Sequence, residues 1–449
     1  MHHTAVHGGE ALITRRALLQ HGLSGAMGAM LAARLSGQTP PGTPNARPAK
    51  ARAVIQVWLW GGPSHVDTFD PKPEAGNDYT GPLNKPIATV AKGMLISELL
   101  PLLAKQADKF SLIRSATHGN GGHETAAYLV QTGRNPNDRV VHPCVGAVVC
   151  LYKGKEQRAD PLVPPYIILT QPQGRFSEAG FLGSRCKPFC TGGDPNAPRF
   201  VVEGLVGQAT EEQLRARRDL LNRVNSLGRV AGDQPTMQAL AKSEDQAYDL
   251  ILGDSGKLFD LNQEKGDLRE RYGRNTFGQS CLMARRLVQR GVPYVTVNYG
   301  GWDTHKENFP AMRRKLPELD KGLATLFDDL KERGLLDSTI VWCCGEFGRA
   351  PKVAWEAPWD GGRHHWGSVF SVLVGGGGFK GGEVVGSSDA KGEQVKNRPV
   401  YPGDLLGSMY ELLGIDPESK LPHPQGLRVR LTPDAEDEEK SGGRLKEIL

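Results

Sequence analysis

Histidine and acidic residues recur beside glycines at several places in the chain. Asp303 and His305 lie two residues apart in the string "GWDTH", so in an extended segment both side chains point to the same side. With His365 from "GRHHWG" they make three ligands that leave one position open, as a catalytic metal ion requires. Imidazole and carboxylate together suit Zn²⁺. The sequence therefore predicts a divalent metal site, with zinc as its first candidate.

A second, more oxygen-rich metal site is predicted from Asp67 and Glu346, completed by Asp70 or His65. Carboxylate-rich sites suit Mg²⁺ or Ca²⁺ as well as Zn²⁺. Any one of these histidines taken alone is better explained as a hydrogen-bonded loop residue. Several of them in glycine-rich loops favour metal binding.

A glycine-rich loop precedes a helix that is predicted to begin near His123. The free N–H groups at the start of a helix attract anions, so a phosphate, sulfate or carboxylate group of a substrate would lie beside His123 and Thr125. The candidate bidentate donors to that anion are Arg134, Arg349 and Arg363. The alternative is that the glycines only form a tight turn and that the arginines lie on the surface.

Short apolar runs alternate with helical patterns along the chain. The predicted strands are Ala53–Trp60, Phe110–Arg114, Tyr166–Thr170, Pro293–Asn298, Thr339–Cys344 and Val369–Val374. The predicted helices are Ile96–Lys109, Glu124–Gln131, Phe277–Arg290, Met312–Arg333 and Asp404–Leu413. Near-continuous apolar strands between helices indicate an α/β fold with a doubly wound, mainly parallel sheet and helices on both of its faces.

In such a sheet, ligands bind outside the carboxyl ends of the strands. The segments with Asp67, His123, Asp303 and Glu346 each follow a predicted strand, and His365 precedes one. Four strand ends and one strand start thus bring His, Asp and Glu side chains, which can bind metal, to the edge where ligands are expected to bind. This shared placement is the main support for a metal site.

Motifs for nucleotide cofactors and serine nucleophiles are absent. The glycines at 376–381 fit G-x-G-x-x-G, but the segment 383–386 that follows is not helical in character. The chain has no G-x-x-x-x-G-K-[ST] and no G-x-S-x-G. We expect no nucleotide cofactor.

Residues 1–36 resemble a twin-arginine export signal. Arg15 and Arg16 precede an apolar, Gly/Ala-rich run from Leu23 to Ala33, shorter than the ~20 residues that span a bilayer. A linker over 37–51 follows. We expect export to the periplasm or beyond, with no stable membrane span in the mature form. The alternative is a basic amphipathic tail.

The 449 residues carry 55 Lys and Arg against 50 Asp and Glu, a formal net charge of +5 that excludes a nucleic-acid partner. We expect one α/β domain over 52–431, with a helical insertion at 208–263 and an exposed tail at 432–449. Among the 7 cysteines, Cys186 and Cys190 are the best-placed pair for a disulfide.

Several strings together resemble one protein family. They are "GGPSHVDTFDPKP", "SELLPLLAKQADKFSLIRSATH", "GFLG", "FGQSCLMARRLVQRGVPYVTV", "GWDTH", "GEFGRAPK" and "GRHHWG". The chain resembles, from about Arg52 to about Leu431, the exported bacterial family catalogued as domain of unknown function 1501, often called sulfatase-like. That family is similar in turn to the alkaline phosphatase and sulfatase superfamily, whose doubly wound sheet carries metal at the strand carboxyl ends.

The resemblance implies that Asp303, His305 and His365 correspond to the Asp/His/His metal set of that superfamily, and Asp67 with Glu346 to its second, carboxylate set. The string "EFG" departs from the usual Asp-His or Asp-Asn before the glycine.

The string "TGR" at 132–134 resembles a sulfatase motif, and counting back from it places the nucleophile position at His123. A usual sulfatase needs a modified Cys or Ser there. Phosphoryl transfer through His123, attack by a metal-activated water and Thr125 as nucleophile all remain open, as does loss of catalysis.

Two functional hypotheses follow. The first is an exported metal-dependent hydrolase of phosphate or sulfate esters, acting on a small anionic substrate or on a sulfated or phosphorylated glycan. The second is a non-catalytic exported protein that binds an anionic ligand, a glycan or a partner through the inherited metal pocket.

Overall fold

The computed structural model of the protein describes most of the chain after the predicted linker. The described residues are 48–136, 140–154, 163–172, 175–198, 254–433 and 439–449, with the single positions 200, 202, 212, 216, 219 and 220. The predicted export signal, most of the linker and most of the helical insertion lie outside the described residues. Residues Arg47–Leu449 group into one compact unit. Among the helices of the described part, none is long and apolar enough to cross a membrane.

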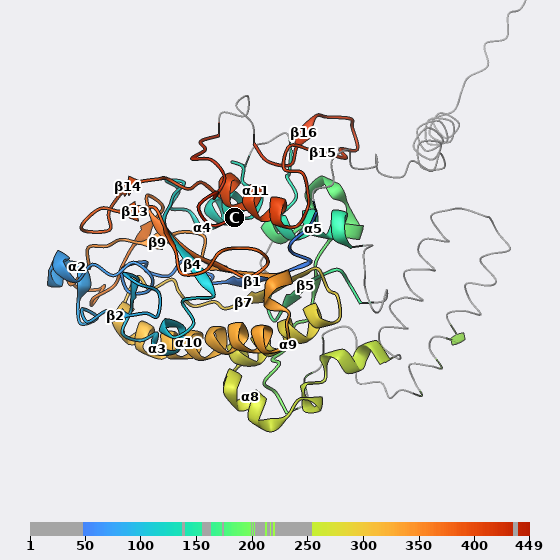
Figure 1. Ribbon diagram of the computed structural model, residues 1–449, viewed down its shortest axis with the longest axis horizontal. Helices are drawn as coiled ribbons and strands as arrows, with labels where there is room; N and C mark the ends of the chain where they lie inside the picture. The colour runs from blue at the N-terminus through green and yellow to red at the C-terminus, as the bar shows by residue number, and fades with distance from the viewer. Residues whose placement is uncertain are drawn as a thin grey trace, which may run out of the picture. The chain divides into compact units, whose positions relative to one another are not determined.

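An eight-stranded sheet forms the centre of this unit, in the order β12-β4-β11-β8-β1-β7-β5-β6 (Figure 1). The strands are β1 (Ala53–Trp58), β4 (Phe110–Ala116), β5 (Tyr166–Leu169), β6 (Phe189–Cys190), β7 (Tyr294–Asn298), β8 (Thr339–Cys344), β11 (Phe370–Gly375) and β12 (Val384–Val385). All six predicted strands are present, and each predicted end lies within two residues of the observed one. The two strands that were not predicted, β6 and β12, have two residues each and lie at the sheet edges.

The direction of strand β11 explains why its start lies at the same sheet edge as the carboxyl ends of other strands. Strand β1 runs parallel to β7 and β8, whereas β11 runs antiparallel to its neighbours β4 and β8. The start of β11 therefore lies at the same edge as the carboxyl ends of β4 and β8. The sheet is mainly parallel, as predicted, and the segment with His365 reaches the ligand edge because β11 is reversed.

Helices cover both faces of the sheet, which confirms the doubly wound α/β architecture (Figure 1). One face packs against α3 (Pro101–Ala104), α9 (Thr276–Gln289) and α10 (Asn308–Glu332), and the other against α4 (His123–Thr132), α5 (Val145–Lys153) and α11 (Pro402–Leu412). Alternate residues of β1 divide between the two cores. Ile55 and Val57 join the first, and Val54 and Trp58 join the second.

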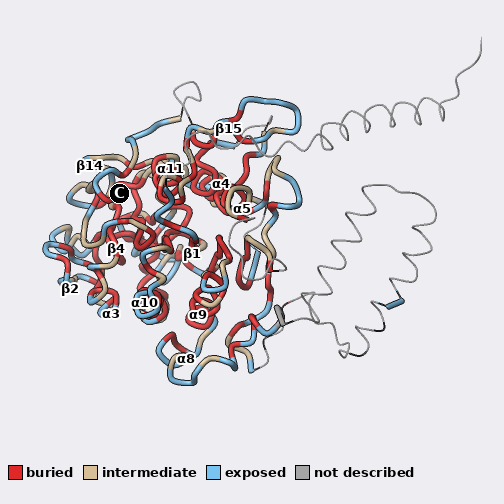
Figure 2. The backbone as a smooth tube through the Cα atoms, turned by 45° about the vertical axis from the view of Figure 1, so that its right-hand side comes forward, coloured by how far each residue is buried: buried red, intermediate tan, exposed pale blue. Residues whose placement is uncertain are grey.

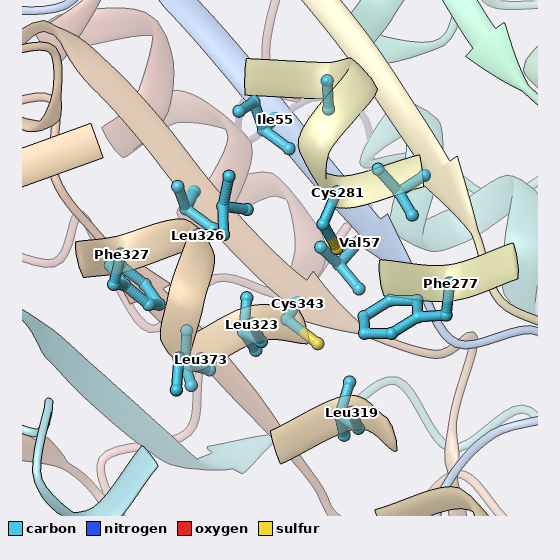
Figure 3. Packing of buried hydrophobic residues seen from close by; sticks show 14 of the residues in the cluster. Ile55, Val57, Phe277, Cys281, Leu319, Leu323, Leu326, Phe327, Cys343 and Leu373 are labelled. Carbon is cyan, nitrogen blue, oxygen red and sulfur yellow. The ribbon is translucent and has the colours of Figure 1, made fainter. Parts of the chain in front are cut away.

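The first core is filled by aliphatic, aromatic and cysteine side chains from β1, β8, β11, α9 and α10 (Figure 3). Strand β1 is buried along its whole length, and α4 and α9 are largely buried (Figure 2). Fully buried parallel strands of this kind leave function to the loops at their ends.

One predicted helix is wrong over most of its length. The segment predicted as a helix from Ile96 to Lys109 is helical only at Pro101–Ala104, and it begins inside a strand pair of β2 (Ile87–Ala88) with β3 (Leu95–Ile96). Proline fits the first turn of a helix but not its interior, so Pro101 marks a start and not a midpoint.

The remaining elements are short. They are α2 (Asn77–Thr80), α8 (Gly266–Tyr272), the strand pairs β9 (Gly348–Arg349) with β10 (His365–Trp366), β13 (Ser387–Ser388) with β14 (Val395–Asn397) and β15 (Lys420–Leu421) with β16 (Val429–Arg430), and 3-10 helices at Pro73–Ala75, Arg175–Ser177, Gly180–Leu182, Ser184–Cys186, Asp254–Phe259, Leu261–Gln263 and Leu336–Ser338.

Two further expectations differ from the structure. The described end of the chain is not simply exposed, because Leu445 and Ile448 are fully buried in the second core and the N–H of Leu445 donates to Ser408 Oγ at 2.9 Å. Cys186 and Cys190 are free thiols and do not form the expected disulfide. Cys186 instead ends a 3-10 helix and is buried against the second core.

Candidate metal centre

Three loops and the start of one helix carry the side chains that meet at the ligand edge. Asp303 and His305 follow β7, Glu346 follows β8, His365 begins β10, and His123 is the first residue of α4. Close packing of these loops depends on glycine. A Cβ atom at Gly61 would lie 2.4 Å from the backbone nitrogen of Asp303, and the φ angle of Gly61 is +111°.

Three imidazole rings point their Nε2 atoms at the Asp303 carboxylate. The Nε2 atoms of His305 and His365 each lie 3.1 Å from Asp303 Oδ1 and 2.8 Å from each other. His123 Nε2 lies 3.3 Å from Asp303 Oδ2. One potential ligand atom from each of His123, Asp303 and His365 lies within 4.8 Å of the other two. Asp303 and His365 of the predicted set thus form one group with His123, and His305 lies beside that group through Asp303 and His365.

The opposite ring nitrogen of each histidine has its own partner. His123 Nδ1 lies 2.5 Å from Glu346 Oε1, His365 Nδ1 donates to the carbonyl of Gly121 at 2.7 Å, and His305 Nδ1 lies 3.2 Å from His364 Nδ1. An acceptor behind Nδ1 fixes the tautomer that leaves Nε2 free to bind a metal ion. This pairing is the usual surrounding of metal-binding histidines.

The donor set fits a zinc-like cation. Two Nε2 atoms 2.8 Å apart cannot both carry a hydrogen toward each other, and both already face the same carboxylate oxygen. A divalent cation satisfies all of these lone pairs together. Three imidazole nitrogens and one carboxylate suit Zn²⁺ and similar transition metals better than Mg²⁺ or Ca²⁺, which prefer oxygen ligands.

Arg349 holds the Asp303 carboxylate in its ionised form. Burial alone raises the pKa of Asp303, but the Arg349 guanidinium and the neighbouring His365 and His123 outweigh it and lower that pKa to about 2. Arg349 is fully buried and also donates to the carbonyl of Gly62 at 2.9 Å and to that of Gly61. The arginine therefore ties the carboxylate to the loop after β1.

Glu346 orients His123. The Glu346 side chain is fully buried and accepts from the N–H of Gly61 at 3.0 and 3.1 Å. Its hydrogen bond to His123 raises the pKa of that imidazole, although partial burial of the ring opposes the shift. Glu346 thus acts behind His123, whereas the sequence suggested a direct metal ligand.

His118 joins two of the loops and was given no role by the sequence patterns. Its Nδ1 accepts from the N–H of Asn120 at 3.1 Å, so Nε2 carries the hydrogen and donates to the carbonyl of Glu346 at 2.7 Å. Burial lowers the pKa of His118 to about 4, which keeps the ring neutral. His364 was missed as well, although the adjacent histidines of "GRHHWG" were its signal.

The predicted second metal site is not assembled. Asp67 is fully buried and accepts two hydrogen bonds from Arg363, both at 2.8 Å, and one from Asn308 at 2.8 Å. Asp70 pairs with Lys72 at 2.9 Å, and His65 Nε2 bonds to the carbonyl of Gly392 at 2.8 Å. Among the described residues no contact joins Asp67 to Glu346. The carboxylate that the sequence assigned to metal instead neutralises a buried arginine.

The three arginines predicted to bind substrate are engaged inside the protein. Arg349 pairs with Asp303, Arg363 pairs with Asp67, and buried Arg134 donates to the carbonyl of Arg430 at 3.0 Å. Thr125 is half-buried on the first turn of α4. The start of α4 is thus the part of the predicted anion site that lies at the metal centre, since His123 is its first residue.

Comparison with known proteins identifies a family over most of the chain. Residues 51–440 match the family DUF1501, described as a protein of unknown function. Among curated proteins, none matches the chain.

Solved structures give distant matches. A lipoteichoic acid synthase from Listeria monocytogenes is 10% identical, with a TM-score of 0.38 over 86% of this chain and 76% of the other. A sulfatase from Pseudoalteromonas sp. is 13% identical, with a TM-score of 0.34 over 88% and 72%. A protein of the alkaline phosphatase superfamily from Vibrio parahaemolyticus is 11% identical, with a TM-score of 0.35 over 83% and 68%. At these values the activities of those proteins are not transferred to this chain.

Proposed function

The chain belongs to the DUF1501 family, and we propose that it is an exported metal-dependent hydrolase of phosphate or sulfate esters. One observation carries the proposal. Three histidine Nε2 atoms converge on one carboxylate, and each histidine has a partner behind its Nδ1 atom. This arrangement serves a metal ion better than any role in the packing of the fold.

His123, His305, His365 and Asp303 would hold the ion. When bound, the ion supplies a Lewis acid that polarises an ester oxygen and neutralises developing charge. The four side chains are between 24% and 45% exposed, so a substrate can reach them from solvent. The donor set favours zinc, and it supports one metal ion at His123, Asp303 and His365, whose ligand atoms lie within 4.8 Å of one another, with His305 beside them.

The start of α4 supplies the anion-binding element of the proposed site. The helix begins at His123 and has no side-chain cap. N–H groups in the first turn of a helix stabilise an anion, and the helix dipole adds to this attraction. A phosphate or sulfate group near the His123 ring would lie beside these donors.

Water is the proposed nucleophile. Both ring nitrogens of His123 have partners, Glu346 on one side and Asp303 on the other, so neither is available to attack an ester. His123 therefore replaces the usual nucleophile with a ligand. Thr125 keeps a place in the substrate region as a half-buried hydroxyl on the same helix.

The first experiment combines metal analysis with an ester panel. The full chain is purified, its metal content measured, and its activity tested on aryl phosphate and aryl sulfate esters. We expect about one equivalent of zinc or a similar metal, with metal and turnover both lost in Asp303→Asn and His305→Ala. The matched control is Asp337→Asn, since Asp337 is exposed and outside the site. Metal content that is unchanged in Asp303→Asn would overturn the proposal.

Binding without turnover is the second candidate function. It is favoured by the number of converging side chains, since four protein ligands are typical of structural zinc sites. Hydrolysis of any ester in the panel that disappears in His365→Ala would exclude this candidate.

Export by the twin-arginine route is part of the proposal, and it rests on Arg15 and Arg16 before the apolar run. Replacement of both by lysine should retain the full-length chain in the cytoplasm of a bacterial host. Cell fractionation measures this. Equal export of the lysine variant would contradict the proposed route.

A further inference from the structure

The tryptophans of this chain are unevenly placed. Three of the seven, Trp58, Trp302 and Trp342, are at most 1% exposed and belong to the interior. Of the four with exposed surface, Trp60, Trp355 and Trp359 lie on loops near the histidines of the metal centre, and Trp366 lies on β10 next to His365.

Trp359 lies beside His364 and beside His305 of the metal centre. Its ring centroid is 4.7 Å from that of His364 in an edge-on contact and 6.2 Å from that of His305. Its carbonyl accepts from the N–H of Glu307 at 3.1 Å, two residues after His305. A ligand that reaches the metal centre along this side must therefore pass the Trp359 ring.

Trp355 is the second tryptophan of the same loop. Its ring stacks on Phe309 at 5.7 Å with an interplanar angle of 22°, and it remains 43% exposed. Phe309 thus packs against the Trp355 ring, and the rest of the side chain is open to solvent.

The loop that carries both rings is held in one shape. Ala354 and Gly362 are joined by a backbone hydrogen bond of 2.9 Å, Gly361 donates to Ala354 at 2.9 Å, and Trp359 donates to the carbonyl of Glu356 at 2.9 Å. The two rings are therefore presented by an ordered loop, which lowers the entropy cost of binding a ligand. We call residues 354–362 the tryptophan loop.

The charge of the tryptophan loop limits what it can bind. Glu356 and Asp360 are exposed at either side of Trp359. Within the described part of the chain, neither carboxylate has a hydrogen bond or ion pair with another residue. Two carboxylates repel an anionic polymer or a lipid phosphate, and they disfavour a purely apolar chain. They accept hydrogen bonds from hydroxyl groups.

We propose that the tryptophan loop is a subsite for a neutral sugar ring. A pyranose presents a face of C–H groups, which packs on an indole ring, and an edge of hydroxyls, which donate to Glu356 and Asp360. The metal centre then takes the anionic ester and the loop takes the sugar that carries it. This inference rests on the proposed function for the ester, but binding of the sugar itself does not require turnover.

The direct test is saturation-transfer NMR with neutral disaccharides on the metal-loaded full chain. The probes are maltose, cellobiose and lactose at millimolar concentration. We expect saturation of ring C–H protons for at least one of them, reduced about tenfold in Trp355→Ala and Trp359→Ala. Phe181→Ala is the matched control, because Phe181 is a half-buried aromatic side chain beside His423. No saturation of any probe, or equal saturation in the tryptophan variants, overturns the subsite.

A second set of variants guards against misfolding. Glu356→Gln with Asp360→Asn changes only exposed side chains and keeps both rings. Without the two carboxylates, the loop should repel a sulfated sugar less strongly. We therefore expect the affinity of the double variant for a disulfated disaccharide to improve about threefold relative to its affinity for the neutral disaccharide. An unchanged ratio of the two affinities would contradict the role assigned to the carboxylates.

Kinetic assays separate this inference from the proposed function. Methyl phosphate and methyl sulfate lack a sugar ring, whereas glucose 6-phosphate and galactose 6-sulfate carry one. In Trp355→Ala we expect the ratio of KM for the accepted sugar ester to KM for the methyl ester to rise about tenfold. If no ester is hydrolysed but saturation transfer is lost in the variants, the subsite stands and the hydrolase proposal fails. If methyl esters are hydrolysed but no sugar binds, the hydrolase proposal stands and the subsite fails.

Discussion

The Nδ1 atom of His123 lies 2.5 Å from Oε1 of Glu346, and Glu346 is itself held by the backbone N–H of Gly61. A carboxylate behind a metal-binding imidazole fixes the ring and raises its basicity. The pair therefore prepares His123 to bind through Nε2.

Replacing Glu346 should weaken metal binding without removing a ligand. We expect Glu346→Gln to lower zinc affinity by about 10-fold to 100-fold at alkaline pH, where proton competition is small. Competition with a chromophoric chelator measures this. Glu332→Gln is the control, since Glu332 is exposed on α10. Complete loss of zinc in Glu346→Gln would instead show that Glu346 is a direct ligand.

Metal binding should release a proton. The Glu346 hydrogen bond raises the pKa of His123 above its ordinary 6.5, so below that raised pKa the ring carries a second proton that a metal ion must displace. Affinity should therefore increase as pH rises through that raised pKa. Calorimetry in two buffers of different ionisation enthalpy counts the protons, and Glu346→Gln should move the transition to lower pH. Metal binding that is independent of pH between 6 and 8 would contradict the assignment.

The sequence was a good guide to the main sheet because its signals are local. Fully buried strands such as Thr339–Cys344 are continuous apolar runs, and their predicted ends match the structure closely. The helix predicted from Ile96 was less reliable, since apolar spacing alone does not distinguish a helix from a short strand followed by a turn. The direction of β11 follows from tertiary pairing and leaves no local trace.

The side-chain partners at the site were harder to predict. Asp303, His305 and His365 were found because the two sequence segments that carry them share one sheet edge. Arg349 and Arg363 were assigned to substrate as bidentate anion donors, yet both are fully buried beside carboxylates. Asp67 and Arg363 lie 296 positions apart, and Asp303 and Arg349 lie 46 apart, so the partner of each buried charge became visible only in the fold.

We expect Asp67 to stabilise the fold and not to bind metal. Its ion pair with Arg363 is fully buried on both sides, and breaking a buried pair leaves an uncompensated charge. We expect Asp67→Asn to destabilise the protein by about 3–5 kcal/mol in urea unfolding. Its folded form should keep the full metal content. Loss of metal from folded Asp67→Asn would restore Asp67 as a metal ligand.

His118 should make the protein sensitive to mild acid. Its pKa is lowered by burial to about 4, whereas the unfolded chain has a value near 6.5, so the unfolded state binds the proton first as the pH falls. The contribution of this residue to stability is complete above about pH 6.5 and is lost as the pH falls toward about 4, by at most about 3 kcal/mol. Thermal unfolding between pH 4 and 7 measures the slope. His118→Gln should flatten it, and His423→Gln, at a half-buried position beside Phe181, is the comparison variant.

Metal should stabilise the folded chain through Asp303. An ion that binds only the folded state adds about 2.7 kcal/mol when its free concentration is 100 times the Kd. We therefore expect zinc to raise the Tm of the wild type and a chelator to lower it again. Asp303→Asn removes the ligand and also leaves Arg349, which is fully buried, without its carboxylate. Its Tm should be low in the absence of zinc and should not respond to zinc. A zinc response in Asp303→Asn equal to that of the wild type would mean that the ion binds elsewhere, because no other carboxylate contacts both His305 and His365 among the described residues.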